Sequence, residues 1–224
     1  LTLTGQSMQV RPRARISPHE RPMNANPPSM FNPDDSLEFG PVRCAWGAYH
    51  HGAVAETMVR PKLAEWLNTA ALELSLARDA YGRPRLDGPN ADFDVSWSHS
   101  GNGLLVALGA NVHVGADLEW LRPRPRALLL AERFFTANET ATLRAWPEAT
   151  REIAFVRLWC AKEAVLKAHG RGLAFGLDRL EFVADGEAWR MTACDAVLGA
   201  PEEWSVHAFT PMPGYVATLA WRRR

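Results

Sequence analysis

The feature that most constrains the fold is a long amphipathic segment from about Arg151 to His169. Its apolar side chains recur at helical spacing along one broad arc, at Phe155, Leu158, Trp159 and Leu166. Thr150 is the expected N-cap, and Gly170 is a residue type at which such a helix commonly ends. The segment therefore predicts one long helix with a buried face.

Three charged residues interrupt or border this apolar arc. Lys162 falls inside the arc, Glu163 lies on its edge, and Lys167 follows Glu163 by four positions. A Glu and a Lys at this spacing form an ordinary helix-stabilising pair worth about 0.2–0.5 kcal/mol, and Lys162 can extend its ammonium group to solvent. From the helix alone, two interpretations of these residues stay open: ordinary surface charges, or residues of a functional site.

Short strand-like segments and further helices surround the long helix. Before it, strands are expected at Val42–Tyr49, at Leu72–Leu76, from Phe93, from Gly103 and at His113–Trp120, with helices at Ala53–Ala70 and Ala127–Phe135. Another helix opens at "TANE", in which Thr136 and Glu139 have capping-box spacing. Four strand segments follow the long helix: "LDRLEFVA", "EAWRMTA", "EEWSVHAFT" and "GYVATLAW". Short strands with tight connections predict an α+β fold built on antiparallel sheets.

Composition excludes several classes of partner. Twenty-five Lys and Arg residues balance twenty-five Asp and Glu residues, so no global field draws the chain to nucleic acid or to an anionic membrane. The longest apolar run, "GLLVALGA", is far shorter than the roughly 20 residues of a membrane span. Three widely spaced cysteines without zinc-ligand spacing favour reduced thiols in a cytoplasmic protein.

The first forty residues differ from the rest of the chain. They are rich in Pro, Asn, Ser and Met, include the basic run "RPRAR", and contain no apolar core segment. We expect residues 1–40 to form a flexible leader. A transit peptide is one alternative, and a natural start at Met8, Met23 or Met30 is another.

Two acidic residues lie two positions apart in the strand segment "GADLEW". Asp117 and Glu119 therefore leave the same face of the sheet. Like charges this close are costly unless a cation or water separates them, and a hard oxygen-preferring cation such as Mg²⁺ would do so. The alternative is a solvated strand face, because this spacing is common.

Two polar loops are expected close to the strands. "SWSHSGN" supplies hydroxyls, an imidazole and glycine-permitted backbone amides, which are good phosphate donors, although turn chemistry explains the loop equally well. "YGRPR" places Arg83 and Arg85 on a tight turn, where plain solvent exposure is the simpler interpretation.

In their order along the chain, the segments "YGRPRL", "FDVSWSHS", "VGADLEW", "RFFTANE" and "FVRLWCAKEAVLKAHGRGL" resemble the signature of the 4′-phosphopantetheinyl transferases, in particular the larger single-chain type that activates surfactin synthetase. The resemblance covers roughly positions 81 to 177. It implies two pseudo-symmetric α+β halves, here residues 41–112 and 113–224, with coenzyme A in the cleft between them. A monomer is also expected on this ground.

The resemblance implies a reaction. The 4′-phosphopantetheine arm of coenzyme A moves to a serine hydroxyl of an acyl, aryl or peptidyl carrier protein, and adenosine 3′,5′-bisphosphate is released. Asp117, Glu119 and Glu163 match the family's Mg²⁺ ligands, and Glu163 also matches its proposed general base. Lys167 matches a lysine placed at the phosphates. Matches for contacts with coenzyme A fall on Ser98, His99, Arg83, Pro84, Arg60 and Lys62. Lys162 is either a scaffold residue or a partial contact with the phosphates.

This chain departs from the family pattern in several places. The N-terminal half is shorter than usual, Arg83 stands where the family has Lys, and Ala116 replaces Val or Ile. An arginine keeps the charge and adds a fork of donors, so phosphate binding survives that change. Two other functions stay open: a non-catalytic module that binds coenzyme A or a carrier, and a Mg²⁺-dependent hydrolase of related pyrophosphates. The identity of the carrier is not encoded in these motifs.

Overall fold

The computed structural model describes residues 30–32, 34–186 and 188–224. Most of the predicted leader, residues 1–29, lies outside them. Its last part is folded: β1 (Ser36–Phe39) pairs antiparallel with β2 (Val42–Ala48), and Phe31 is buried in the core. The predicted end of the leader at residue 40 is therefore wrong, because the folded body includes β1.

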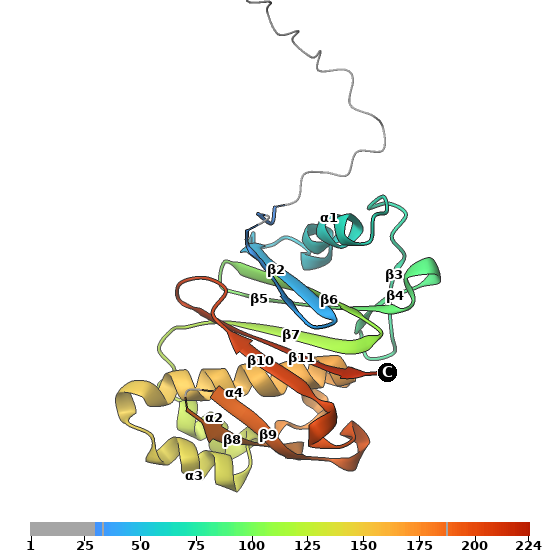
Figure 1. The fold of residues 1–224 in the computed structure, drawn as a ribbon. Helices are drawn as coiled ribbons and strands as arrows, with labels where there is room; N and C mark the ends of the chain where they lie inside the picture. Colours follow the sequence, from blue (N-terminus) through green and yellow to red (C-terminus); the bar gives the residue numbers. More distant parts are fainter. Residues whose placement is uncertain (1–29, 33, 187) are drawn as a thin grey trace, which may run out of the picture.

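The two larger sheets lie next to each other, with a helix on the outer side of each (Figure 1). α1 (Ala55–Trp66) covers the outer face of a four-stranded sheet of order β1-β2-β6-β5, in which β5 spans Phe93–Ser100 and β6 spans Gly103–Ala110. A three-stranded sheet of order β10-β11-β7 follows, with strands Ser205–Phe209, Tyr215–Arg223 and Val112–Trp120. α4 (Glu148–His169) packs against its far face.

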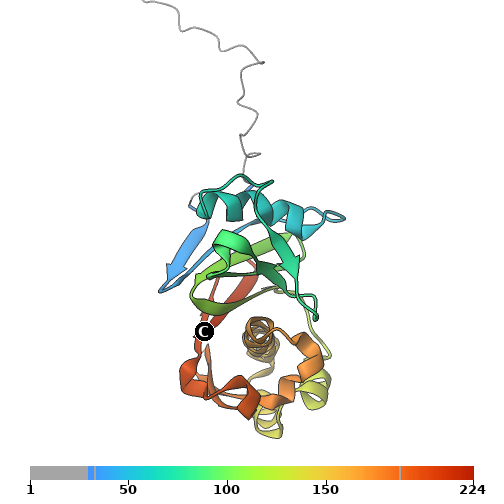
Figure 2. The same ribbon diagram turned by 90° about the vertical axis from the view of Figure 1, so that its right-hand side faces the viewer.

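The remaining elements surround α4, which Figure 2 shows nearly end-on. They are α2 (Ala127–Phe134), α3 (Ala137–Ala145) and the hairpin of β8 (Leu180–Asp185) and β9 (Ala188–Cys194). A small hairpin of β3 (Leu76–Arg78) and β4 (Pro84–Leu86) lies at the edge of the first sheet. All strand pairs are antiparallel, so the predicted α+β fold with antiparallel sheets is confirmed.

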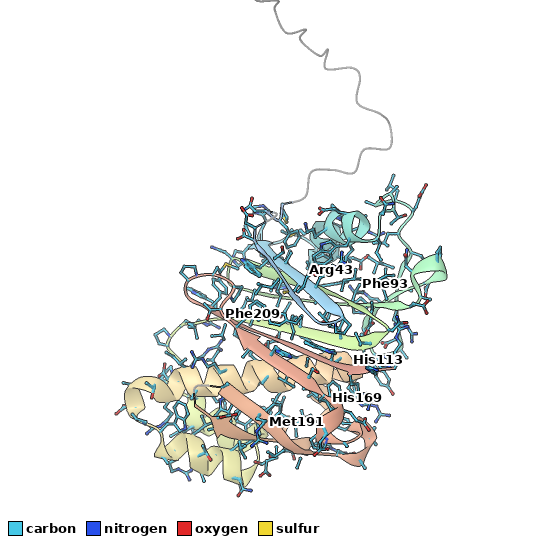
Figure 3. The ribbon with its side chains drawn as sticks, in the orientation of Figure 1. Arg43, Phe93, His113, His169, Met191 and Phe209 are labelled. Carbon is cyan, nitrogen blue, oxygen red and sulfur yellow. The ribbon has the colours of Figure 1, made fainter. Side chains whose placement is uncertain are left out.

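Three apolar clusters lie between these layers. One is under α1, one lies between the two larger sheets, and the largest surrounds α4. Phe209, labelled in Figure 3, shows how the halves join. It belongs to β10 but packs against Phe39 and Trp46 of the first sheet, with ring centroids 5.7 and 5.9 Å apart. No helix in the described ranges has the length and hydropathy needed to cross a bilayer.

The edges of the two larger sheets are joined by side chains of β5. These side chains accept hydrogen bonds from backbone N–H groups of β7: Val114 to Asp94 Oδ2 (2.8 Å), Ala116 to Ser96 Oγ (3.0 Å) and Trp120 to Ser100 Oγ (3.0 Å). Partner numbers rise together, so β5 and β7 run in the same direction. The bonds satisfy backbone donors that have no strand partner on this edge. "SHS" is thus the end of β5, whereas the sequence placed it in a loop.

Local signals in the sequence predicted some helix boundaries and missed others. The capping box of Thr136 and Glu139 is present, and Gly170 ends α4 with φ 96°. Thr150 is not the N-cap of α4, which begins at Glu148 after Pro147. The strand predicted at Leu72–Leu76 begins only at Leu76, the first residue of β3, and Leu72 sits in a turn with 98 % of its surface exposed.

Candidate active site

β7 and α4 bring the predicted carboxylates together. Alternate residues of β7 fill the core between the sheets, so the opposite face, with Gly115, Asp117 and Glu119, points toward α4. Gly115 permits the close approach, because a Cβ there would lie 1.9 Å from the carbonyl oxygen of Ala164. Glu163 directly precedes Ala164. The prediction that the two strand carboxylates share one face is confirmed.

Lys167 of α4 links the first carboxylate to β5. Its Nζ lies 2.7 Å from Oδ1 of Asp117 and donates to the hydroxyl of Ser98 at 2.9 Å, while Ser98 donates to the same Oδ1 at 3.0 Å. Burial lowers the pKa of Lys167, but the charges of Asp117 and Glu163 outweigh burial and the net pKa is raised. The site therefore holds a charged ammonium group.

Glu119 has two partners at one oxygen. Its Oε2 accepts a 3.3 Å hydrogen bond from the hydroxyl of Ser100 and a 2.8 Å bond from Nη2 of Arg124. Burial and the nearby charge of Asp117 raise the pKa of Glu119, and the guanidinium group of Arg124 opposes that shift. Arg124 neutralises a charge that would otherwise face another carboxylate.

Glu163 differs from the two strand carboxylates. Within the described residues it has no ion pair and no side-chain hydrogen bond. Burial and then the charge of Asp117 raise its pKa to about 7, although Lys167 acts in the opposite direction. At neutral pH this carboxyl group is poised to gain or lose a proton.

The chemistry of the three carboxylates fits a Mg²⁺ site, but their arrangement does not. The three carboxylates are the hard oxygen ligands that this ion prefers, and Oδ2 of Asp117 is buried without a hydrogen-bond partner. Yet within residues 30–32, 34–186 and 188–224 no three His, Cys, Asp or Glu side chains converge closely enough to hold a metal ion. Protein cations, Lys167 and Arg124, are bonded to two of the carboxylates instead.

A cavity of 240 Å³ opens beside this cluster. Arg83, Pro84 and Lys167 are among the residues that line it. The Nε of Arg83 donates to the backbone oxygen of Lys167 at 2.9 Å, and Nη2 pairs with Asp94 and donates to the backbone oxygen of Val114 at 3.1 Å. The structure thus brings the "YGRP" turn to α4, although the two are far apart in sequence.

His99 leaves β5 on the opposite face from Ser98. Its ring stacks on Tyr49 with centroids 4.1 Å apart and planes 5° apart. Burial, with the positive charge of Lys167 as the next cause, lowers the pKa of His99, so its imidazole is neutral at pH 7. The residue as a whole is exposed although Tyr49 covers one face of its ring, and His99 is not part of the hydrogen bonds that join Ser98, Asp117 and Lys167.

Lys162 lies in the core, which favours the scaffold role over the partial phosphate contact that was also predicted for it. The side chain is fully buried, and its Nζ lies 2.7 Å from Glu139 and donates to backbone oxygens of Leu177 and Leu180 at 2.8 and 2.5 Å. Glu139 in turn accepts from the backbone N–H of Phe182 at 2.8 Å. Lys162 therefore ties α4 to α3 and β8.

Arg60 and Lys62 are also engaged elsewhere. Nη1 of Arg60 donates to backbone oxygens of Leu74 at 2.6 Å and Ala71 at 3.2 Å, which fixes the loop after α1. Lys62 is buried and pairs with Glu65 at 2.8 Å. Neither residue is brought to the carboxylate cluster.

Sequence reasoning missed four residues that support the site. Asp94, Ser96 and Ser100 bond β5 to β7, and Arg124 pairs with Glu119. The alternation D-x-S-x-S-x-S from Asp94 to Ser100 was a detectable signal, because it puts four short polar side chains on one strand face. Arg124 carried no comparable signal among the arginines of "RPRPR".

Comparisons with known proteins agree with the resemblance seen in the motifs. A sequence profile described as the 4′-phosphopantetheinyl transferase superfamily matches residues 113–220. The chain is 31 % identical over 166 residues to 4′-phosphopantetheinyl transferase HetI of Nostoc sp., a match that covers 73 % of this chain and 67 % of HetI. It is 32 % identical over 130 residues to 4′-phosphopantetheinyl transferase ffp of Bacillus subtilis, covering 58 % and 56 %.

A third relative is 4′-phosphopantetheinyl transferase Sfp of Bacillus subtilis, 29 % identical over 130 residues, or 58 % of this chain and 56 % of Sfp. Apart from HetI, the chain spans about half the length of these curated relatives. All the residues of the carboxylate cluster on β7 and α4 fall within the profile match.

Proposed function

The chain belongs to the 4′-phosphopantetheinyl transferase superfamily, and on that premise we propose that it transfers the 4′-phosphopantetheine arm of coenzyme A to a serine of an apo carrier protein. One observation carries the proposal: the bonded group of Lys167, Ser98 and Asp117, with Glu119 and Glu163 on the same interface. A cation and three carboxylates beside a cavity are suited to a pyrophosphate and a divalent ion. The proposed location is the cytoplasm, and the proposed state is a monomer.

The proposed reaction exchanges one P–O bond for another. The serine Oγ of the carrier bonds to the phosphorus that bears pantetheine, and the bond from that phosphorus to adenosine 3′,5′-bisphosphate breaks. The serine proton passes to the carboxylate of Glu163, directly or through one water, and the leaving phosphate departs as an anion. Without a metal ion the carboxyl group of Glu163 has a pKa of about 7 and can accept such a proton near neutral pH. A bound Mg²⁺ would make this carboxylate a weaker base.

The other residues of the site bind and orient. Lys167 lines the cavity with a positive charge and stabilises negative charge on the phosphates, with Ser98 and Asp117 fixing its position. Arg83 and Pro84 line the same cavity, which at 240 Å³ is sized for part of a nucleotide rather than for the whole of coenzyme A. His99, neutral and exposed, is proposed to contact a phosphate through an N–H group.

Asp117, Glu119 and Glu163 are the residues that would hold Mg²⁺. When bound there, the ion would neutralise charge on the pyrophosphate oxygens and so make the phosphorus a better electrophile. The buried, unpartnered Oδ2 of Asp117 supports this assignment. Arg124 and Lys167 would have to share or release the carboxylates that they now contact.

The proposal is tested by incubating the protein with coenzyme A, Mg²⁺ and a panel of apo acyl, aryl and peptidyl carrier proteins, and measuring carrier mass. We expect the mass of one phosphopantetheine arm to appear on at least one carrier. Asp117→Asn and Glu163→Gln should abolish the gain. Glu148→Gln is the matched control, because Glu148 is exposed in the first turn of the same helix.

Two outcomes would contradict the transferase. Binding of coenzyme A without mass gain on any carrier would favour the non-catalytic module, and breakdown of coenzyme A in the absence of carrier would favour the hydrolase. Full transfer by Glu163→Gln would leave the transferase intact but exclude Glu163 as ligand and base.

A further inference from the structure

Each strand carboxylate of the site has a protein cation as its partner. Asp117 has Lys167 at 2.7 Å, and Glu119 has Arg124 at 2.8 Å. The two pairs differ in what holds the cation. Lys167 is held by Ser98 as well, whereas no other side chain in the described ranges accepts a hydrogen bond from the guanidinium group of Arg124.

The pair of Glu119 and Arg124 is incompletely satisfied. Its side chains are 19 % and 24 % exposed, and Nε of Arg124 is buried without a hydrogen-bond partner. A buried donor without an acceptor costs about 1–3 kcal/mol, which offsets part of what the pair contributes. A divalent cation at Glu119 would therefore replace a guanidinium group that is not fully bonded, while keeping the carboxylate paired with a positive charge.

The backbone of Arg124 is fixed even though its side chain is exchangeable. Its N–H donates to Glu152 Oε2 of α4 at 2.7 Å, and its carbonyl accepts from the N–H of Ala127 at the start of α2. The side chain lines a cavity of 90 Å³ whose walls include Phe155 and Trp159. That cavity gives the guanidinium group room to move beside two aromatic residues.

We propose that Arg124 is a positioning residue whose guanidinium group occupies the position beside the Glu119 carboxylate in which a divalent cation would bind, until such a cation displaces it. Arg124 then sets the affinity of the site for that cation, and Ser100, bonded to the same Oε2 and to the backbone of Trp120, keeps Glu119 oriented during the exchange. This inference rests on the proposed function, since it assumes that Glu119 binds the metal.

The experiment is a calorimetric titration of MgCl₂ into the full chain with saturating coenzyme A and no carrier. We expect Arg124→Gln to bind Mg²⁺ about fivefold more tightly than the wild type, because a competing cation of modest pairing strength is removed. Arg124→Lys keeps a competing charge and should stay within about twofold of the wild type. Arg122→Gln is the matched control: it removes an exposed charge two residues away and should leave the affinity unchanged.

The direction of the change in Mg²⁺ affinity decides whether or not Arg124 competes with the cation for Glu119. An unchanged or weaker affinity in Arg124→Gln, with a melting temperature that shows a folded protein, overturns the inference, while carrier modification by the wild type leaves the proposed function standing. An equal gain in Arg122→Gln also overturns it, since the effect would then be general charge. Absence of Mg²⁺ binding in both wild type and Arg124→Gln overturns the metal assignment itself.

Discussion

The hydroxyl group of Ser98 donates to Oδ1 of Asp117 at 3.0 Å, and two residues further along each strand Ser100 donates to Oε2 of Glu119 at 3.3 Å. The spacing of the serines on β5 thus equals that of the carboxylates on β7, because the strands run in the same direction. The hydroxyls predicted as phosphate donors are therefore engaged in orienting the acidic residues. Orientation fixed by such bonds is what metal ligands and catalytic groups require.

The serines of β5 allow a separation of stability from activity. Ser96 and Ser100 each accept a hydrogen bond from a backbone N–H of β7, but only Ser100 also contacts a carboxylate. Ser96→Ala leaves a buried donor unsatisfied and should lower the free energy of unfolding by about 1–3 kcal/mol. Ser96 also lines the 240 Å³ cavity, so any effect on activity should fall on KM for coenzyme A and leave kcat per folded molecule little changed. Denaturant unfolding and carrier-modification rates measure the two quantities.

Ser100→Ala should show the reverse pattern. The N–H of exposed Trp120 can bond to water, so the stability loss should be smaller than for Ser96→Ala. Loss of the hydroxyl group that orients Glu119 should lower kcat/KM about tenfold. Ser100→Thr, which keeps the hydroxyl, should restore most of the activity. Equal activity losses in Ser96→Ala and Ser100→Ala would show that activity depends on the whole bonded edge of β5 and not on the orientation of Glu119 by Ser100.

The sequence predicted the components of this site but not their contacts. Asp117, Glu119, Glu163 and Lys167 lie on regular elements, where periodicity determines the face from which each side chain projects. Periodicity says nothing about which cation will pair with which carboxylate. Arg124, in a loop with other arginines, could be assigned only after the packing of α2, α4 and β7 was known.

Lys162 shows a related limit of sequence reasoning. Its place in the apolar arc was correctly predicted, but the meaning of that place depends on Glu139, which comes from a separate helix. The same helical position is compatible with a buried lysine and with a lysine whose side chain extends to solvent. The predicted leader failed at its end for a comparable reason, since the strand of Ser36–Phe39 forms only because β2 supplies a partner edge.

Gly115 is expected to control the distance between α4 and β7. Because a Cβ at this position would meet Ala164 O at 1.9 Å and Ala168 N at 2.5 Å, Gly115→Ala must push the helix away. We expect a loss of about 3 kcal/mol in the free energy of unfolding, together with loss of transfer activity, since Lys167 would move from Asp117. Urea unfolding monitored by tryptophan fluorescence measures the first effect.

A control for this substitution is Gly52→Ala. Gly52 has φ 85° and no neighbouring atom within 4 Å of its added Cβ, so only the backbone cost of about 1–2 kcal/mol applies. If Gly115→Ala were no more destabilising than Gly52→Ala, the helix would have room to move, and the close approach would not determine the geometry of the site.

The buried pair of Lys162 and Glu139 should behave as part of the core. Lys162→Met leaves a fully buried carboxylate without its partner and should cost about 3–5 kcal/mol of stability, and Glu139→Gln in the same chain should recover part of that loss. A double-mutant cycle by chemical denaturation measures the coupling. A stable Lys162→Met protein with weakened binding of coenzyme A would instead restore the contact predicted from the sequence.

Glu163 should make stability depend on pH between its unfolded and folded pKa values. Burial and the charge of Asp117 raise the folded pKa from 4.5 to about 7. The folded protein thus prefers the neutral acid, and the associated stability, complete below pH 4.5, is lost as the pH rises through 7. Glu163→Gln mimics the neutral acid at every pH. It should match the wild type at pH 4.5 and exceed its stability by up to about 3 kcal/mol at pH 8.5.

The measurement is urea unfolding of wild type and Glu163→Gln across that range, in buffer with a chelator so that no divalent cation compensates the charge. Other groups whose pKa is shifted, including Glu119, are present in both proteins, so their contributions largely cancel in the difference. Glu148→Gln, exposed on the same helix, should show no such trend. A difference between wild type and Glu163→Gln that stays constant from pH 4.5 to 8.5 would mean that Glu163 titrates as an ordinary carboxyl group and is not poised to accept a proton at neutral pH.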